Sequence, residues 1–395
     1  MLSFEFASAA RIQFGRGSLA GIGSAAAAFG TRALVICGSE PSRAARLLEL
    51  LRAAGTEIAV KTVRGEPSFE AVRALLAEAR PFDAQVVIGF GGGSVVDSAK
   101  AVSALLANPG DPLDYAELIG GGKSLVVPAL PCIAIPTTAG TGSEVTRNAV
   151  LSSAESQVKV SLRSPTMLPR LALVDPELCM GLPAQVTAST GMDALTQLVE
   201  PFVCNRPNPL TDALCREGIR RAASALPRAV ASGLDGDARE GMSLAALFSG
   251  LALANSRLGL VHGFAAPIGG VTGAAHGAIC AALLPAVAAA NIRAMREREP
   301  SNPGLARYAE VGLLLRAARE AAAGEAEPGA VPPEEAPLLL AELAKGIGIR
   351  GLSATGLGKG DFPAVIERAK VASSTQGNPI RLEDRELLEI LERSY

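Results

Sequence analysis

The stretch AQVVIGFGGGSVVDSAKAVSALLA, residues 84–107, decides the fold class of this chain. It begins as an apolar run, AQVVIGF, with the length and composition of a strand buried on both faces. Three glycines follow, and the chain then continues as a helical segment in which Ser94 is a candidate N-cap. A buried strand that leads through a tight turn into a helix is typical of a parallel sheet covered by helices.

Three further apolar runs repeat this pattern along the N-terminal half. They are ALVICG (33–38), EIAVKTV (57–63) and PCIAIP (131–136), with helical segments between them. After LALVDPELCMGLP, strand signals nearly vanish and Ala- and Leu-rich helical periodicity continues to the C-terminus. We therefore predict an α/β, Rossmann-like, dinucleotide-binding domain over residues 1–180 and an all-helical domain over residues 181–395.

The composition argues against several classes of protein. The 395 residues carry 37 basic and 39 acidic side chains without a block of like charge, which disfavours a nucleic-acid surface. No run of 18 apolar residues occurs, and Glu5 and Arg11 interrupt the N-terminal stretch, so we expect neither secretion nor membrane insertion. Six scattered cysteines without a CxxC pair are typical of reduced thiols, and we expect a cytoplasmic protein.

Two polar turns follow predicted strands at their carboxyl ends. In the first, the glycines at 91–93 would let the backbone approach a ligand, and the N–H groups that begin the following helix favour an anion such as pyrophosphate. The second, PTTAGTGSE (136–144), offers hydroxyls and glycines at the sheet edge where open α/β folds bind ligands. The first turn alone fits a plain strand-to-helix connection equally well. Together the two turns predict a nucleotide-binding site.

His262 and His276 are the only histidines, and both fall in the segment LVHGFAAPIGGVTGAAHGAICAALLP. Imidazole is the commonest neutral metal ligand, although most histidines in proteins are structural. Pro267 and the pair Gly269-Gly270 predict that one helix ends between the histidines and another begins. The two rings could then converge from different elements, but a metal site would also need a carboxylate.

The chain resembles the iron-containing, or group III, alcohol dehydrogenase family over essentially its whole length. Motifs that carry the resemblance, in the family's order, are GGGSVVDSAK (91–100), AIPTTAGTGSEVT (134–146), LALVDPEL (171–178), TGMDALTQLVE (190–200), and GLVHGFAAPIGG with HGAICAALLPAV (259–287). The resemblance implies a Rossmann-like domain followed by a helical domain. It also implies reversible hydride transfer between NAD(P) and a small alcohol or its aldehyde or ketone, in a homodimer or larger homo-oligomer.

The resemblance also implies positions for cofactor binding. The pyrophosphate loop falls on Gly92, Gly93 and Ser94 with Asp97 behind it, the second loop on Thr137, Thr138, Thr141 and Ser143, and the lysine that reaches toward the nicotinamide ribose on Lys159. Gly38 stands where NAD-preferring members often carry an acid for the ribose 2′-hydroxyl. Its lack of a carboxylate, with Ser39 and Arg43 nearby, leaves room for a 2′-phosphate. We therefore expect a slight preference for NADP.

The family's metal positions fall on Asp193, Gln197, His262 and His276, and the resemblance makes Asp193 and the two histidines the catalytic centre. Asp193 and Gln197 are spaced i, i+4 and would share one helix face, although Asp193 could instead be a helix N-terminal acid. One carboxylate and two imidazoles suit Fe²⁺ or Zn²⁺. Members of the family usually carry histidine where this chain has Gln197 and Ala266, so we expect weaker metal binding and a changed proton route.

Three other interpretations remain open. Gln197 is compatible with a metal-independent reductase resembling maleylacetate reductase. The two substitutions are also compatible with a nucleotide-binding protein whose catalysis is impaired. A lyase resembling dehydroquinate synthase would share the fold, although the motifs match the dehydrogenases more closely.

Overall fold

The computed structural model describes residues 3–117, 119–153, 158–325 and 329–395, and the chain divides into two compact units. The first, here the sheet unit, comprises residues 7–138 and 142–179. The second, here the helical unit, comprises residues 180–395 together with the N-terminal residues up to Phe6 and residues 139–141. The three residues 139–141 lie within the second polar turn, so that turn contributes to both units.

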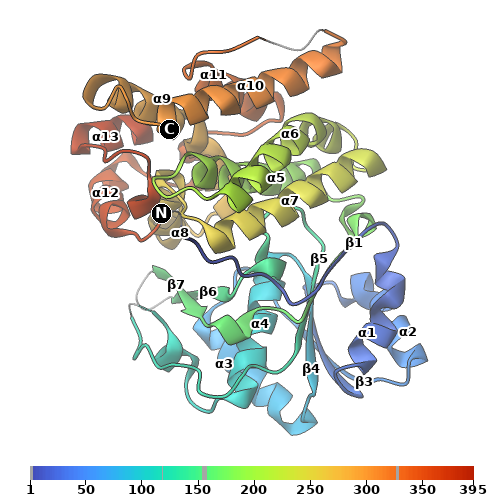
Figure 1. The fold of residues 1–395 in the computed structure, drawn as a ribbon. Coiled ribbons are helices and arrows are strands. Elements are labelled where there is room, and N and C mark those ends of the chain that lie inside the picture. Colours follow the sequence, from blue (N-terminus) through green and yellow to red (C-terminus); the bar gives the residue numbers. More distant parts are fainter. Residues whose placement is uncertain (1–2, 118, 154–157, 326–328) are drawn as a thin grey trace. The chain divides into compact units, whose positions relative to one another are not determined.

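The sheet unit is built on a six-stranded parallel sheet with the order β1-β8-β5-β4-β2-β3 (Figure 1). The strands are β1 (Ile12–Phe14), β2 (Arg32–Cys37), β3 (Glu57–Thr62), β4 (Val86–Gly91), β5 (Cys132–Pro136) and β8 (Leu171–Val174). All residues of β4 and β5 are buried, which explains why these central strands are apolar throughout rather than alternating. The four predicted runs coincide with β2 to β5, and the predicted fold class is confirmed.

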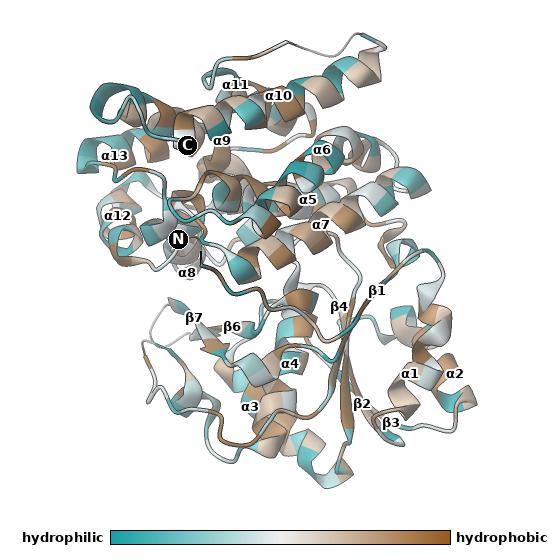
Figure 2. Ribbon diagram, viewed as in Figure 1, coloured by the Kyte–Doolittle hydropathy of each residue, from teal (hydrophilic) through white to brown (hydrophobic). Residues whose placement is uncertain are grey.

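Helices cover both faces of this sheet. They are α1 (Ile22–Ala27), α2 (Ala45–Ala53), α3 (Phe69–Ala79) and α4 (Gly93–Ala107). Side chains alternate along each strand, so Leu34 and Ile36 of β2 pack with α3 and α4, whereas Val35 packs with α1 and α2. The two hydrophobic clusters that result lie on opposite faces, and the central strands are correspondingly brown in Figure 2.

An antiparallel hairpin, β6 (Asn148–Ser153) with β7 (Val158–Arg163), lies outside the main sheet and was not predicted. Its buried residues Ala149, Leu151, Val160 and Leu162 join the same hydrophobic cluster as α3 and α4. The sequence hides this hairpin because each strand has only six residues and, in β6, the exposed Val150 stands between the buried Ala149 and Leu151, which breaks the alternation of apolar and polar residues.

No strand occurs among the described residues of the helical unit. Its helices are α5 (Ala184–Val203), α6 (Pro209–Ala231), α7 (Gly236–Asn255), α8 (Leu260–Thr272), α9 (His276–Arg298), α10 (Gly304–Ala323), α11 (Glu335–Gly346), α12 (Phe362–Val371) and α13 (Asp384–Arg393). Helix α5 is central: it packs against α6, α7, α9 and α10, and every residue from Gly191 to Val203 is buried. A helix buried on all sides is usually apolar all round, so four polar side chains in the buried part of α5 stand out: Asp193, Thr196, Gln197 and Glu200.

The prediction that Pro267 and Gly269-Gly270 end a helix is wrong. Helix α8 continues through them to Thr272 and ends at Gly273, whose φ of 68° lies in the left-handed region. Proline removes one helical hydrogen bond, but Pro267 and Ile268 are buried, and this packing outweighs the local penalty. The break between the two histidine-bearing helices therefore lies at residues 273–275.

Helix α9 is the one described helix that, taken singly, is long and apolar enough to cross a membrane, and α7 with α8, bent by 97°, would add a second candidate. In this structure 67% of the most apolar window of α9 is buried. It packs against α5, α8, α10, α11 and α13, so most of its apolar surface lies in the core of the helical unit.

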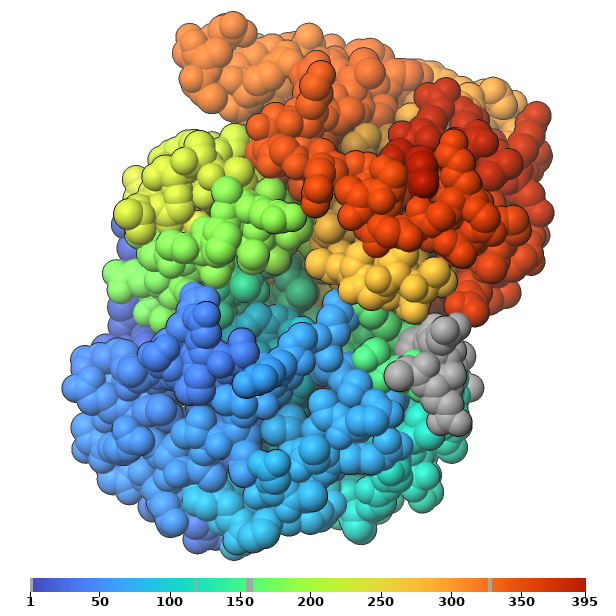
Figure 3. Space-filling view, turned by 180° about the vertical axis from the view of Figure 1, so that it is seen from behind, coloured from blue at the N-terminus to red at the C-terminus, as the bar shows by residue number. Residues whose placement is uncertain are grey.

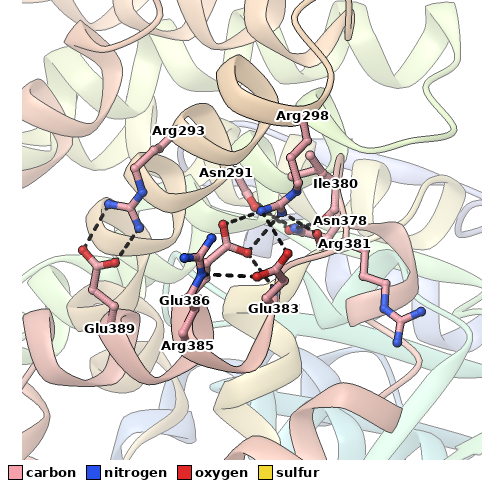
Figure 4. A network of polar contacts seen from close by, with 10 residues as sticks. All are labelled: Asn291, Arg293, Arg298, Asn378, Ile380, Arg381, Glu383, Arg385, Glu386 and Glu389. Atoms are coloured by element: carbon pink, nitrogen blue, oxygen red, sulfur yellow. Dashed lines mark hydrogen bonds and ion pairs between the residues drawn. The ribbon is translucent and has the colours of Figure 1, made fainter.

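The C-terminal segment is fixed to α8 and α9. In Figure 3 the red C-terminal residues lie beside the gold residues of α8, against which α12 packs. Figure 4 shows Arg293 and Arg298 of α9 paired with Glu389 and Glu386 of α13. Nearby, Asn378 accepts hydrogen bonds from Asn291 and, at 3.3 Å, from the backbone N–H of Leu260 at the start of α8. These buried hydrogen bonds of Asn378 help to fix the N-terminus of α8, the helix that carries His262.

Candidate functional site

The predicted nucleotide-binding residues of the sheet unit gather at one edge of the sheet. Strands β2, β4 and β5 are neighbours and end at Cys37, Gly91 and Pro136. Gly38, Gly92, Gly93, Thr137 and Thr138 follow these strand ends directly. The backbone N–H of Thr137 donates to the Gly91 carbonyl at 2.9 Å, so the two turns are joined. This is the edge at which open parallel sheets bind ligands.

The first turn is tightly packed. Gly92, not Ser94, is the N-cap of α4, and Ser94 is already the second helical residue, so the N-cap interpretation of Ser94 is wrong. A Cβ on Gly91 would lie 2.6 Å from Cγ2 of Val95, so only glycine fits there. Because a glycine N-cap has no side chain to accept from the first helical N–H groups, the start of α4 suits an anion.

Asp97 and Ser143 bind to each other. The Ser143 hydroxyl donates to the Asp97 carboxylate, which also accepts from the Val150 N–H at 3.0 Å. Asp97 forms an ion pair with Lys100, which is fully buried and donates to the Ser143 carbonyl and the Thr146 hydroxyl, each at 2.9 Å. These contacts hold the second turn against α4. The sequence analysis gave Lys100 no role, although a lysine in a mostly apolar helix is a signal that could have been used.

The remaining predicted cofactor residues have different surroundings. Lys159 lies on β7 and forms an ion pair with Glu66. Thr141 belongs to the helical unit, as does Gly140, whose carbonyl oxygen lies 3.3 Å from the Ser249 hydroxyl of α7. The contacts of Lys159 and Thr141 with a cofactor therefore remain predictions.

A cluster of potential metal ligands lies within the helical unit. Asp193 comes from α5, His262 from α8 and His276 from the first position of α9. The Asp193 Oδ1 atom lies 3.8 Å from Nε2 of His262 and 3.6 Å from Nε2 of His276. One ligand atom from each of these residues and from Cys280 lies within 4.8 Å of all the others. Three helices thus bring together the carboxylate and both imidazoles singled out in the sequence.

The surroundings of two atoms in this cluster indicate that a cation would fit between them. Within the described part of the chain, Asp193 Oδ1 and His262 Nε2 are buried and have no hydrogen-bond partner. A buried polar atom without a partner costs about 1–3 kcal/mol, so two such atoms facing each other are unfavourable unless something binds both. A divalent cation would satisfy both at once, and one carboxylate with two imidazoles is a suitable donor set for Fe²⁺ or Zn²⁺.

Glu200 orients one of these imidazoles. Its Oε2 lies 2.6 Å from Nδ1 of His262, and its Oε1 accepts from the Val261 N–H, also at 2.6 Å. Because a carboxylate only accepts, Nδ1 carries a proton, and Nε2, which faces Asp193, is the nitrogen available to a metal. Burial alone would lower the pKa of His262, but Glu200 and then Asp193 outweigh it and raise that pKa above its usual value.

Glu200 was missed at the sequence level. It lies two helical turns after Asp193 on α5, so the spacing i, i+7 places both on one face. That spacing was visible within TGMDALTQLVE.

Gln197 and Asp193 are both buried in the middle of α5. Because α5 begins at Ala184, the alternative that Asp193 is a helix N-terminal acid is wrong. The Gln197 side-chain oxygen lies 3.1 Å from the Ser249 hydroxyl. Ala266 lies on α8 one turn after His262 and is half-buried.

Gly277 explains how His276 reaches the cluster. A Cβ at this position would lie 2.4 Å from the Ser189 carbonyl oxygen and 3.2 Å from Cβ of Asp193. Only glycine therefore lets the start of α9 approach α5 this closely. The close approach brings His276 to Asp193.

A parallel sheet with glycine-rich turns at its ligand-binding edge, followed by a helical unit with a buried carboxylate and two imidazoles, fits a nucleotide-binding enzyme with a candidate metal centre. Residues 9–176 match the family described as iron-containing alcohol dehydrogenase, and residues 187–395 match the C-terminal domain of the Fe-containing alcohol dehydrogenase family. The chain belongs to the iron-containing alcohol dehydrogenase family, and it is an oxidoreductase.

Individual relatives agree with this assignment. The chain is 36% identical to a 1,3-propanediol dehydrogenase of Klebsiella pneumoniae over 352 residues, which cover 89% of this chain and 86% of the relative. It is 34% identical to an NAD-dependent methanol dehydrogenase of Bacillus methanolicus, covering 83% and 82%. The solved structure of a 1,3-propanediol oxidoreductase superposes with a TM-score of 0.90 at 33% identity, covering both chains completely.

We expect the Glu200→Gln substitution to weaken metal binding by about 10–100-fold, the usual effect of losing a carboxylate that orients a histidine ligand. Glutamine keeps the size of the side chain but removes its charge beside His262. Competition with a chelator measures the affinity. Glu217→Gln on α6, which removes a partly buried partner of Arg220 and Arg221, is the matched control and should bind metal normally. Equal affinities in the two variants would contradict the orienting role of Glu200.

Proposed function

We propose that this chain catalyses reversible hydride transfer between a small alcohol and its aldehyde or ketone, using NAD(P) and a divalent metal held by Asp193, His262 and His276. The observation that supports the metal most directly is the pair of buried atoms without partners, Asp193 Oδ1 and His262 Nε2, which face each other at 3.8 Å. The sheet edge beside Gly92 and Thr138 would hold the nucleotide.

The residues around the proposed metal have separate roles in the reaction. A bound metal would act as a Lewis acid toward the substrate oxygen. Asp193 supplies the negative charge that holds a cation, and Glu200 keeps the proton of His262 on Nδ1, away from the metal side of the ring. Ala266 offers no group that accepts a proton, so the alcohol proton would leave through water or the ribose hydroxyls.

The cofactor of this chain is proposed as NAD or NADP, with a slight preference for NADP. Gly38 follows β2 and lacks the carboxylate that would bind a ribose 2′-hydroxyl, and a Cβ there would meet open space. Ser39 and Arg43 are exposed nearby and could bind a 2′-phosphate. The relative from Bacillus methanolicus is named as NAD-dependent. Comparing kcat/KM for NADH and NADPH would decide between the two.

A cytoplasmic homodimer or larger homo-oligomer is proposed as well. All six cysteines are free and buried, as expected of a protein that works under reducing conditions. The oligomeric state rests on the family resemblance, and light scattering on the eluting protein would measure it.

We expect complete removal of metal with a chelator to abolish alcohol-dependent NAD(P)H formation, and addition of Fe²⁺ or Zn²⁺ to restore it. The reason is that Asp193 and Glu200 offset any positive charge on the imidazoles and Ala266 is apolar, so the side chains alone present no net positive charge to the substrate oxygen. Absorbance of NAD(P)H with a panel of primary alcohols and aldehydes provides the assay, and metal analysis verifies the stripping. Full activity in metal-free protein would instead support the metal-independent reductase.

A further inference from the structure

We propose that Cys280 is a fourth metal ligand in this chain and occupies the coordination position that Gln197 leaves weakly filled. The proposal rests on the metal site of the proposed function and extends it, because Cys280 lies outside the set of ligands that the family resemblance implies.

Cys280 lies one turn after His276 on α9, so both side chains project from one face of the helix. Its sulfur is 3.5 Å from Nε2 of His276, and it belongs to the group of four ligand atoms that lie within 4.8 Å of one another. The residue is fully buried. The thiol is therefore part of the same cluster as Asp193 and both histidines.

The spacing of these atoms fits a tetrahedral centre. Zinc bonds of about 2.0–2.3 Å to oxygen, nitrogen and sulfur require ligand atoms about 3.3–3.8 Å apart. Three of the six separations are 3.8 Å from Asp193 to His262, 3.6 Å from Asp193 to His276 and 3.5 Å from His276 to Cys280, and the other three are at most 4.8 Å. Three of the six edges therefore have the lengths that a bound ion would impose.

Two further observations point to a ligand at this place. Asp193 Oδ1 and His262 Nε2 are buried without partners and belong to the same cluster as the thiol. The oxygen of Gln197, in contrast, has a hydrogen-bond donor within reach, the Ser249 hydroxyl at 3.1 Å. Cysteine is also the stronger ligand, since a thiolate carries charge and a carboxamide does not.

Coordination by Cys280 changes the chemistry of the site. The thiol would lose its proton to solvent as the sulfur–metal bond forms, so metal uptake would release one more proton than an Asp-His-His site alone. Thiolate is a soft ligand and favours zinc or cobalt over harder cations. We therefore expect this chain to retain zinc more firmly than a site with an amide in fourth position.

The experiment loads the full-length wild-type protein with Co²⁺ and records its absorption spectrum, because a cobalt–thiolate bond gives an intense near-ultraviolet charge-transfer band. The same spectrum is recorded for Cys280→Ser and for Cys215→Ser, the latter replacing an equally buried thiol on α6. Zinc affinity by chelator competition and proton release on zinc addition are measured for all three proteins.

We expect the band in wild-type protein and in Cys215→Ser, and its loss in Cys280→Ser. That variant should also release one proton fewer and bind zinc at least about tenfold more weakly. A wild-type protein that binds cobalt without the band would overturn the proposal, as would a band that persists in Cys280→Ser. If Cys280→Ser does not fold, the wild-type spectrum still tests the proposal, because the absence of the band would overturn it.

Different experimental results would refute the proposed function and the ligand role of Cys280. Metal-dependent alcohol oxidation without a cobalt–thiolate band refutes only the cysteine ligand. Wild-type protein that binds neither cobalt nor zinc and works without metal refutes both.

Discussion

The Asp193→Asn variant should lose at least about a thousandfold in kcat/KM for alcohol oxidation. Asparagine has nearly the same shape, so this buried position on α5 stays filled, but the only carboxylate among the proposed ligands is gone. Charge stabilisation by a bound metal is worth several kcal/mol, and each 1.36 kcal/mol is about tenfold in rate. The metal content after dialysis should fall together with the activity.

The control for Asp193→Asn is Asp83→Asn, which removes an exposed carboxylate paired with Arg32. It should retain wild-type kcat/KM and metal content. Circular dichroism establishes that Asp193→Asn is folded, so that lost activity can be assigned to the site. A folded Asp193→Asn protein with full metal content and a kcat/KM within a few-fold of wild type would show that another group holds the metal.

The central sheet could be predicted from the sequence because β2, β4 and β5 are buried on both faces and therefore continuously apolar. The hairpin of β6 and β7 has one buried face and short strands, and its register becomes clear only when Leu151 and Leu162 are seen against α3 and α4. The continuation of α8 through Pro267 could not be predicted either. It depends on burial in the finished core, which a local rule about proline does not include.

The residues of the candidate site, too, could be predicted from the sequence only in part. Asp193, His262 and His276 were identified through the family resemblance, and the structure brings them together in one cluster. Glu200 and Cys280 were missed, although each follows a predicted ligand at helical spacing, i+7 after Asp193 and i+4 after His276. Such spacings recur throughout any helix, so only the distances between helices show which of them matter.

The Lys100→Met variant should lower the free energy of unfolding of the sheet unit by about 3–5 kcal/mol, the usual cost of leaving a buried charge without its partner. Lys100 is fully buried, and its ammonium pairs with Asp97 at 3.0 Å and donates to Ser143 and Thr146. Methionine fills the space but leaves those acceptors unsatisfied. A drop of roughly 6–20 °C in Tm follows, measured by calorimetry, with weaker NAD(P) binding because the second turn is released.

Two control variants separate the effect of the lost charge in Lys100→Met from the effect of changed packing. Lys123→Met removes an exposed partner of Asp114 and should hardly change the Tm. Adding Asp97→Asn to Lys100→Met removes the uncompensated carboxylate, so part of the lost stability should return, because removing both partners of a buried pair costs less than removing one. If the single variant melts no lower than Lys123→Met, or if the double variant melts lower than the single one, the Asp97–Lys100 pair does not hold the second turn against α4.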